Sequence, residues 1–225
     1  MDKFALIGWP AAGSLSPLLF GAAYGGKYGY GFIEQQDWAT AWRIFTEGDY
    51  RAVNVTAPHK MEAARAAAWR SPEVEAIGAA NILVKTDDGI KAYNSDYLAV
   101  KQLIRIHAPE ARTAVVVGFG GAGKAAFRAA LDCGISTTVK RHSELTDGVC
   151  ADLVIFTLPK AAPGMENILC NTLIEANYRD PQCESLVGVG HYVGGREWLR
   201  AQAVLGYEIM TGEAPDRDAI GQVKI

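Results

Sequence analysis

The chain has 225 residues, of which 49% are hydrophobic and 21% are charged, and its formal net charge is −3. This balance is typical of a globular protein and excludes a disordered or collagen-like chain. No basic excess exists to drive general binding to a nucleic-acid backbone. No stretch approaches 18 apolar residues, so the sequence predicts neither a membrane-spanning helix nor a membrane partner.

The cysteine and histidine usage points away from disulfides and metals. Cys133, Cys150, Cys170 and Cys183 form no C-x-x-C pair and are too sparse for a disulfide scaffold. The N-terminus lacks the apolar run and cleavage site of a signal peptide, so we expect reduced thiols in a cytoplasmic protein. The four histidines fall at no zinc-ligand spacing, so no metal is expected, and His59 is expected to face solvent.

The first half of the chain alternates short apolar runs with helical patterns. Phe4–Gly8 is expected to be a buried strand, and a polar turn then leads to a helix with Ser16 as N-cap and Pro17 at its first position. Asp37 is expected to cap the next helix. Further strands are predicted at 30–33, 51–55, 80–84 and 90–93, with a hairpin at Asp88-Gly89 and a helix from Pro58 to about Trp69.

The second half continues the same rhythm. Asp96 is expected to precede a helix that ends before Pro109. Strands are predicted at 113–117, 137–140, 153–157 and 186–189, with helices from the glycine-rich turn to about Cys133 and over 198–209. Such alternation predicts parallel sheets with helices on both faces.

A glycine-rich turn joins the strand at 113–117 to its helix. Gly118, Gly120 and Gly123 form G-x-G-x-x-G, in which the first glycine permits a tight turn and the second lets the backbone approach a pyrophosphate. The third lets the helix pack on the strand, and the helix N-terminus favours the anion. We therefore predict that this turn, Gly121 and Ala122 included, binds a dinucleotide. The alternative is a glycine-rich turn without a ligand.

The end of the following strand indicates which dinucleotide. An NAD site would carry Asp or Glu there, whereas this chain has Lys140 and Arg141. Arg141 can grip a 2′-phosphate through two donors, which favours NADP; the alternative is a solvated basic turn. Only about ten residues separate Arg141 from the strand near Asp152, which leaves no room for a further helix and edge strand. The nucleotide domain is therefore predicted to be shortened.

Five further segments carry polar groups that packing alone does not need. They read G-W-P-A-A-G-S-L-S-P (8–17), N-V-T-A-P-H-K (54–60), G-A-A-N (78–81), Y-N-S-D (93–96) and G-R-E-W-L-R-A-Q-A (195–203). Together with the glycine turn, their order and spacing resemble the shikimate dehydrogenase family, which includes quinate dehydrogenases. The resemblance covers almost the whole chain.

The resemblance implies two α/β/α domains. Residues 1–102 plus 195–225 would form an N-terminal substrate-binding catalytic domain, to which the C-terminal helices return. Residues 103–194 would form a shortened Rossmann-like NADP-binding domain. The implied reaction is the reversible, NADP-dependent reduction of 3-dehydroshikimate to shikimate in aromatic amino acid (chorismate) biosynthesis. The protein would act on this small molecule as a monomer or homodimer.

The matched motifs also imply residue roles. Lys60 and Asp96 would be the catalytic pair that relays the proton of the reacting hydroxyl. The resemblance implies that the residues around the substrate are Ser14, Ser16, Thr56, Asn81, Gln202 and Tyr178. Taken singly, each of these residues has a plainer interpretation as a turn, cap, surface or core residue.

The cofactor half departs from the family pattern. Phe156 stands where the family usually has asparagine, and Glu197 and Trp198 replace a glycine and a methionine near the nicotinamide. The leading interpretation is a shikimate dehydrogenase, because Lys60 and Asp96 form a proton-relay pair that a mere binder does not need. The alternatives are a quinate-type dehydrogenase, or a shikimate-binding paralogue with weak or no cofactor turnover, which the departures favour.

Overall fold

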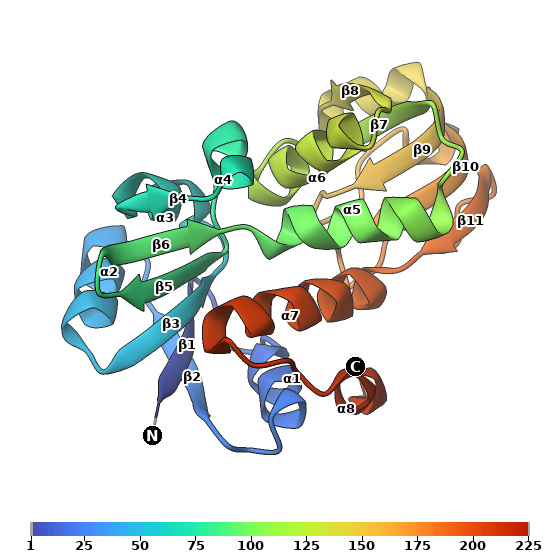
Figure 1. The fold of residues 1–225 in the computed structure, drawn as a ribbon. Helices are drawn as coiled ribbons and strands as arrows, with labels where there is room; N and C mark the ends of the chain where they lie inside the picture. Colours follow the sequence, from blue (N-terminus) through green and yellow to red (C-terminus); the bar gives the residue numbers. More distant parts are fainter. Residues whose placement is uncertain (1, 225) are drawn as a thin grey trace. The chain divides into compact units, whose positions relative to one another are not determined.

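The computed structural model describes residues 2–224, and these fold into two compact α/β units. The first unit holds the residues up to Ser95 together with those from Gln202 onward, and the second is Asp96–Ala201. Each unit contains one β-sheet (Figure 1). The predicted α/β class, with strands and helices in alternation, is confirmed.

The first unit is built on a six-stranded sheet in the order β2-β1-β3-β5-β6-β4. Its strands are β1 (Lys3–Gly8), β2 (Gly29–Glu34), β3 (Tyr50–Val55), β4 (Trp69–Arg70), β5 (Ile82–Thr86) and β6 (Gly89–Tyr93). β1 pairs in parallel with β2 and β3, so the loops that follow these three strands leave from one edge of the sheet. The expected hairpin is confirmed, because β5 pairs antiparallel with β6.

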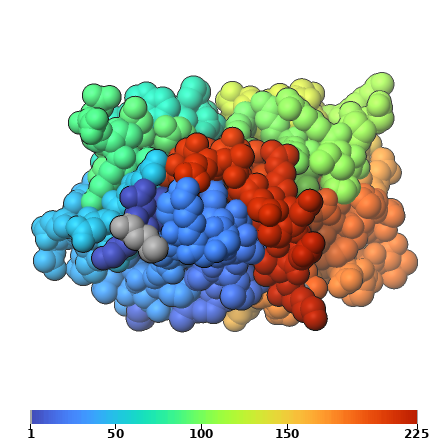
Figure 2. All heavy atoms as spheres, turned by 60° about the horizontal axis from the view of Figure 1, so that its bottom comes forward, coloured from blue at the N-terminus to red at the C-terminus, as the bar shows by residue number. Residues whose placement is uncertain are grey.

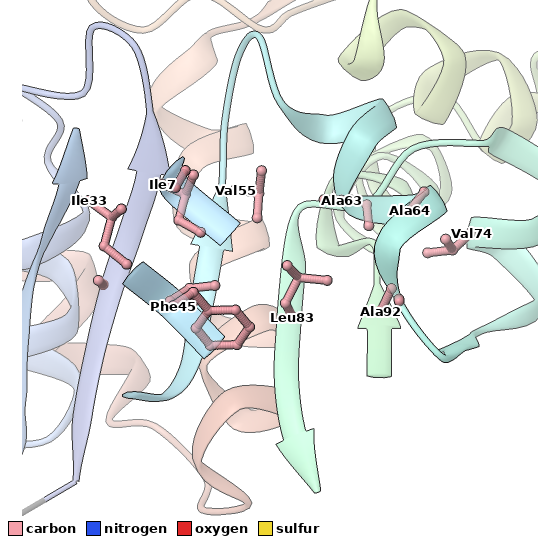
Figure 3. Close-up of a cluster of buried hydrophobic side chains, with 14 residues drawn as sticks. Ile7, Ile33, Phe45, Val55, Ala63, Ala64, Val74, Leu83 and Ala92 are labelled. Carbon is pink, nitrogen blue, oxygen red and sulfur yellow. The ribbon is translucent and has the colours of Figure 1, made fainter. Parts of the chain in front are cut away.

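Helices cover both faces of this sheet. They are α1 (Ser16–Ala23), α2 (Trp38–Glu47), α3 (Lys60–Ala66), α4 (Pro72–Ile77), the end of α7 (Gly195–Thr211) and α8 (Arg217–Gln222). On one face, Phe45, Ala63 and Val74 from α2, α3 and α4 meet Ile7 and Leu83 from the strands in one buried cluster (Figure 3). This apolar burial stabilises the sheet on which the loops are mounted.

The opposite face is packed with aromatic rings. Side chains alternate along a strand, so Phe4 points away from Ile7 and meets Phe20 of α1 at a ring distance of 5.0 Å. Phe20 in turn contacts Tyr207 of α7 at 4.9 Å. The backbone N–H of Asp216 donates to a carbonyl at the end of α1, and the red C-terminal segment lies against the blue N-terminal one (Figure 2). The expected return of the C-terminal helices to the first unit is confirmed.

The second unit has a five-stranded sheet in the order β11-β10-β9-β7-β8, parallel throughout. Its elements are α5 (Ser95–His107), β7 (Thr113–Val117), α6 (Gly121–Asp132), β8 (Ser136–Lys140), β9 (Val149–Phe156), β10 (Ile168–Glu175), β11 (Val189–Val193) and the start of α7. Only a six-residue 3-10 helix, His142–Asp147, joins β8 to β9, and β8 is an edge strand of the sheet. The predicted shortening of the nucleotide half is therefore confirmed.

The helix at the N-V-T-A-P-H-K segment is shorter than predicted. It was expected to run from Pro58 to about Trp69, but α3 begins at Lys60 and ends at Ala66. Trp69 pairs with β6 as part of the short strand β4. Pairing across the sheet has therefore overridden the helical preference of the alanine-rich sequence.

Two expected helix caps lie inside their helices. Ser16 is the first residue of α1 rather than its N-cap, and its backbone N–H donates to the Ser14 hydroxyl. Asp96 lies within α5, which begins at Ser95. The backbone N–H of Ser95 donates to the side chain of Asn81, so a residue far away in sequence satisfies the start of this helix.

The strands at the end of the second sheet were also predicted incorrectly. β10 was not expected, and the strand expected at 186–189 begins only at Val189. β10 contains Asn171 and ends in Glu175, which is fully buried. A polar residue inside a buried strand breaks the apolar pattern from which a strand is predicted.

Candidate functional site

The two serines of the first motif lie together at the start of α1. Glu34, at the end of β2, accepts the backbone N–H groups of Ala11 at 2.9 Å and Ala12 at 3.2 Å, which fixes the loop after β1. The Ser14 hydroxyl donates to the Ser16 hydroxyl at 3.1 Å, and both residues are half-buried. Two adjacent hydroxyls can donate to one carboxylate. Glu34 lies outside the motif, so no sequence pattern singled it out.

Two tyrosine hydroxyls donate to residues of the first two motifs. The Tyr207 hydroxyl donates to the carbonyl of Ser16 at 3.1 Å, and the Tyr30 hydroxyl donates to Asn54 at 2.8 Å. Burial raises the pKa of Tyr30 well above its usual range. The Tyr30 hydroxyl therefore stays protonated and acts as a donor to Asn54.

Asn81 is the centre of a buried hydrogen-bond network. Its side-chain N–H₂ donates to the Ser95 hydroxyl at 3.1 Å and to Gln202 Oε1 at 3.3 Å. Its side-chain carbonyl oxygen accepts the Ser95 backbone N–H at 2.7 Å. The structure thus brings together Asn81 and Gln202, two predicted substrate residues from distant segments. Ser95 was not predicted as a site residue, although it lies within the Y-N-S-D motif, and that motif could have indicated it.

The N-V-T-A-P-H-K segment is tied to the same region of the first unit. Lys60 is half-buried at the first position of α3, and its carbonyl accepts the backbone N–H of Ala80 at 2.8 Å. Half-buried Thr56 packs so close to Gly8 that a side chain on that glycine would overlap it. His59 was expected to face solvent but is buried, with Nε2 at 2.7 Å from the Gln35 carbonyl.

In the second unit, Asp96 has a partner that the sequence did not predict. The carboxyl group lies in the first turn of α5 and is 4% exposed. The indole N–H of Trp198, which is 3% exposed, donates to Asp96 Oδ1 at 3.3 Å. The motifs singled out each residue separately, but no pattern linked two positions 102 residues apart.

The three glycines of the turn between β7 and α6 have different surroundings. Gly118 has φ +92°, a conformation that favours glycine. A Cβ on Gly123 would overlap the carbonyl of Gly118, so the third glycine permits the helix to approach the strand. A Cβ on Gly120 would meet nothing within 4 Å, so this side of the turn is open at the N-terminus of α6. The turn therefore fits a pyrophosphate.

The two basic residues after β8 have different surroundings. The Lys140 ammonium donates to the carbonyls of Gly148 at 2.9 Å and Glu144 at 3.2 Å. Arg141 is exposed, and its backbone N–H donates to the Glu144 carboxylate at 2.6 Å. Lys140 thus holds the short connection to β9, while Arg141 presents its side chain at the surface next to a carboxylate.

Tyr178 lines a cavity of about 330 Å³ after the ends of β10 and β11. The start of α7 forms its other wall, with Arg196, Glu197 and Arg200. The Tyr192 hydroxyl, also in the wall, donates at 2.7 Å to the buried carboxylate at the end of β10. Burial is the main cause that raises the pKa of Tyr192, and the hydrogen bond to this carboxylate raises it further. The Tyr192 hydroxyl therefore stays protonated.

Phe156 and Glu197, the two other residues that depart from the family pattern, each contact identified neighbours. Phe156 is fully buried in the apolar core at the end of β9, so it adds no polar group there. The Glu197 carboxylate lies 2.6 Å from His107 Nε2, and His107 Nδ1 lies 3.1 Å from His191 Nε2. Glu197 is therefore engaged with a histidine pair.

Residues 2–224 offer neither a metal cluster nor a membrane span. Within this range, no group of three or more His, Cys, Asp or Glu side chains could hold a metal ion. Over the same residues, no helix has both the length and the apolar character needed to cross a membrane.

Known proteins resemble this chain in sequence. Residues 6–83 match the family model of the shikimate dehydrogenase substrate binding domain. A shikimate dehydrogenase (NADP(+)) from Halobacterium salinarum is 37% identical over 161 residues, 68% of this chain, and the match spans only 60% of that relative. One from Dehalococcoides mccartyi is 26% identical over 224 residues, which cover 96% of this chain and 76% of the relative.

A solved structure resembles the chain over nearly its full length. It is the shikimate 5-dehydrogenase from Thermus thermophilus, crystallised in complex with NADP(H) and shikimate. The TM-score is 0.84 at 24% sequence identity, and the alignment covers 98% of this chain and 97% of the other. This likeness shows that the fold is shared.

Proposed function

From the premise that this chain belongs to the shikimate dehydrogenase family, we propose that it is an NADP-dependent oxidoreductase acting on a CH–OH group. Its substrates are shikimate and 3-dehydroshikimate, which places the reaction in aromatic amino acid biosynthesis. The family model supports this proposal, and so do the two relatives described above, which are both named shikimate dehydrogenase (NADP(+)).

The observation that carries the proposal is the hydrogen-bond network around Asn81. This residue belongs to the matched substrate-binding segment, and it is joined to Gln202 from the late G-R-E-W-L-R-A-Q-A motif. The network holds the Gln202 side chain beside the matched segment, and a side-chain amide can both donate to and accept from a ligand rich in hydroxyl groups. Ser14 and Ser16, side by side at the start of α1, supply donors for the substrate carboxylate.

Lys60 and Asp96 are proposed as the proton-relay pair. When bound, NADP supplies the hydride acceptor or donor. As the reacting hydroxyl becomes a carbonyl, it must lose its proton, and an amine next to a carboxylate can take that proton and return it in the reverse direction. A protonated Lys60 also stabilises negative charge on the reacting oxygen. The support is the position of both residues in the matched motifs. Thr56 is proposed as a further hydrogen-bond partner of the substrate.

The cofactor is proposed to lie on the second unit. Gly118, Gly120 and Gly123 with the neighbouring Gly121 and Ala122 would hold the pyrophosphate at the start of α6, where the turn is open. Arg141 is the proposed ligand of the 2′-phosphate, with Lys140 shaping the turn beside it. Tyr178 is proposed to lie near the substrate.

The substrate and the cofactor are proposed to bind to different domains. Residues 1–102 plus 195–225 would form the substrate-binding catalytic domain, and residues 103–194 the nucleotide domain. The support is that the family match at residues 6–83 falls within the first range and the glycine turn within the second.

The test is the appearance of reduced nicotinamide when the purified protein meets shikimate with NADP. Parallel reactions contain NAD, or quinate in place of shikimate, and the Lys60→Ala variant is the control. Lysine-dependent reduction that prefers NADP and shikimate is expected. No reduction by a folded protein that still binds shikimate would overturn the enzyme proposal in favour of a binding protein. A preference for quinate would replace the substrate.

A further inference from the structure

Trp198 is the feature of the second unit that the proposed reaction does not yet use. It lies in the first turn of α7, and its indole is 3% exposed. Its one N–H group donates to Oδ1 of Asp96, which belongs to the same unit. An indole can donate but cannot accept a hydrogen bond, so this contact has a fixed direction.

A buried carboxylate is stable only when donors surround it. The 3.3 Å contact occupies Oδ1 and leaves the second oxygen to other groups. Trp198 is itself held in place, since it is buried and the preceding Glu197 is anchored on His107 at 2.6 Å. The indole therefore restricts the rotation of the Asp96 carboxyl group about its Cβ–Cγ bond.

The resemblance implies methionine at this position, and the methionine side chain has no N–H group. Position 198 of this chain thus provides a donor to a carboxylate that the usual residue does not provide. The adjacent departure, Glu197, points to a histidine pair and so does not compete for the same partner.

We propose that Trp198 is a positioning residue that holds the Asp96 carboxylate, through its indole N–H, in the orientation used for proton relay. This inference rests on the proposed function, in which Asp96 is catalytic. Trp198 acts through Asp96 and supplies no proton itself.

Kinetics test the role of the N–H group. Trp198→Phe keeps an aromatic ring and Trp198→Met supplies the usual family residue, and both remove the donor. Each is expected to lower kcat about three- to tenfold, with KM for shikimate and NADP changed less than about twofold. Trp69→Phe, at a tryptophan 45% exposed in the other unit, is the matched control and is expected to leave kcat unchanged.

A double-mutant cycle separates positioning from general packing. In an Asp96→Asn background, Trp198→Phe is expected to lower kcat by less than about twofold further. An equal loss in both backgrounds would overturn the proposal, because the tryptophan would then act independently of Asp96. A loss in Trp198→Met but none in Trp198→Phe would also overturn it, because ring packing would be the cause.

Nuclear magnetic resonance tests the contact without requiring turnover. The indole N–H peak that disappears in Trp198→Phe is expected to exchange slowly with solvent, and to shift and exchange faster in Asp96→Ala. An unchanged peak would overturn the proposal. If the wild-type protein reduces neither cofactor, the proposed function fails, and this peak alone decides whether Trp198 holds the carboxyl group.

Discussion

Lys60 occupies a position that helix stability does not favour. It is the first residue of α3, where the positive end of the helix dipole repels a cation. The dipole alone would favour a neutral or acidic residue at this position. The place of Lys60 at the start of α3, where its carbonyl accepts the Ala80 backbone N–H, agrees with the proposed role of the lysine in chemistry on the ligand.

Replacement of Lys60 by alanine should separate activity from stability. We expect turnover of shikimate to fall by about a hundredfold or more, because the proton acceptor and the cation are both lost. The thermal midpoint should change little, because the first position of a helix does not favour a cation. Steady-state kinetics and thermal unfolding measure the two effects. Lys3→Ala, at an exposed lysine, is the control. Retained turnover in Lys60→Ala would remove the lysine from the mechanism.

Arg141 and Glu144 set opposite charges at the end of β8. The guanidinium favours a 2′-phosphate, while the carboxylate held on the Arg141 backbone N–H disfavours one. Arg141→Ala should therefore weaken binding of NADP more than binding of NAD, and Glu144→Gln should strengthen NADP relative to NAD. Calorimetric titration of both cofactors gives the ratios. Equal weakening of both cofactors by Arg141→Ala would show that this turn does not read the phosphate.

At the scale of elements, the turn between β7 and α6 separates two uses of glycine. Gly123 is required by the fold, because a side chain there would overlap the chain's own backbone. Gly120 has open space beside it and an extended backbone with φ −75°, which any residue can adopt. Packing therefore does not explain this glycine, which agrees with its proposed role in the approach of a ligand.

A pair of alanine substitutions tests this distinction. Gly120→Ala should leave the thermal midpoint nearly unchanged and weaken NADP binding, because the methyl group obstructs the pyrophosphate. Gly123→Ala should weaken binding and also destabilise the protein by about 1–3 kcal/mol, as overpacking does. Thermal unfolding and cofactor titration are measured on both variants. Unchanged NADP affinity in Gly120→Ala would place the pyrophosphate elsewhere.

Elements with local signals were the ones predictable from the sequence. The hairpin at Asp88-Gly89 and the glycine turn carry their geometry in a few consecutive residues, and both are confirmed. β4 and β10 depend on remote partners. Trp69 belongs to a strand only because it pairs with β6. The buried carboxylate of Glu175 in β10 is tolerated only because loop N–H groups and a tyrosine hydroxyl donate to it. Such tertiary effects leave no periodicity to detect.

In the candidate site too, contacts between distant segments could not be predicted from the sequence. Motifs identified Asn81 and Gln202 individually, and the structure joins them. The supporting residue Glu34 and the Trp198–Asp96 contact could not be predicted, because each depends on a carboxylate meeting a donor from a distant segment.

At the scale of the whole molecule, the two units carry different parts of the proposed machinery. The serine turn and the Asn81 network belong to the first unit, and the glycine turn and Arg141 belong to the second. The missing strand beyond β8 leaves that strand at the sheet edge, where backbone N–H groups are less protected than in the central β9. Each ligand should therefore leave its own pattern of protection.

Hydrogen–deuterium exchange with mass spectrometry can read these patterns along the chain. NADP alone should slow exchange at 118–123 and at the turn after β8, whereas shikimate alone should slow exchange at 11–16 and around Asn81. Without ligand, β8 should exchange faster than β9. Quinate at the same concentration is the matched control for shikimate. Protection of 11–16 by NADP instead of shikimate would reverse the assignment of the two units, since the serine turn would then bind the cofactor's phosphates rather than the substrate's carboxylate.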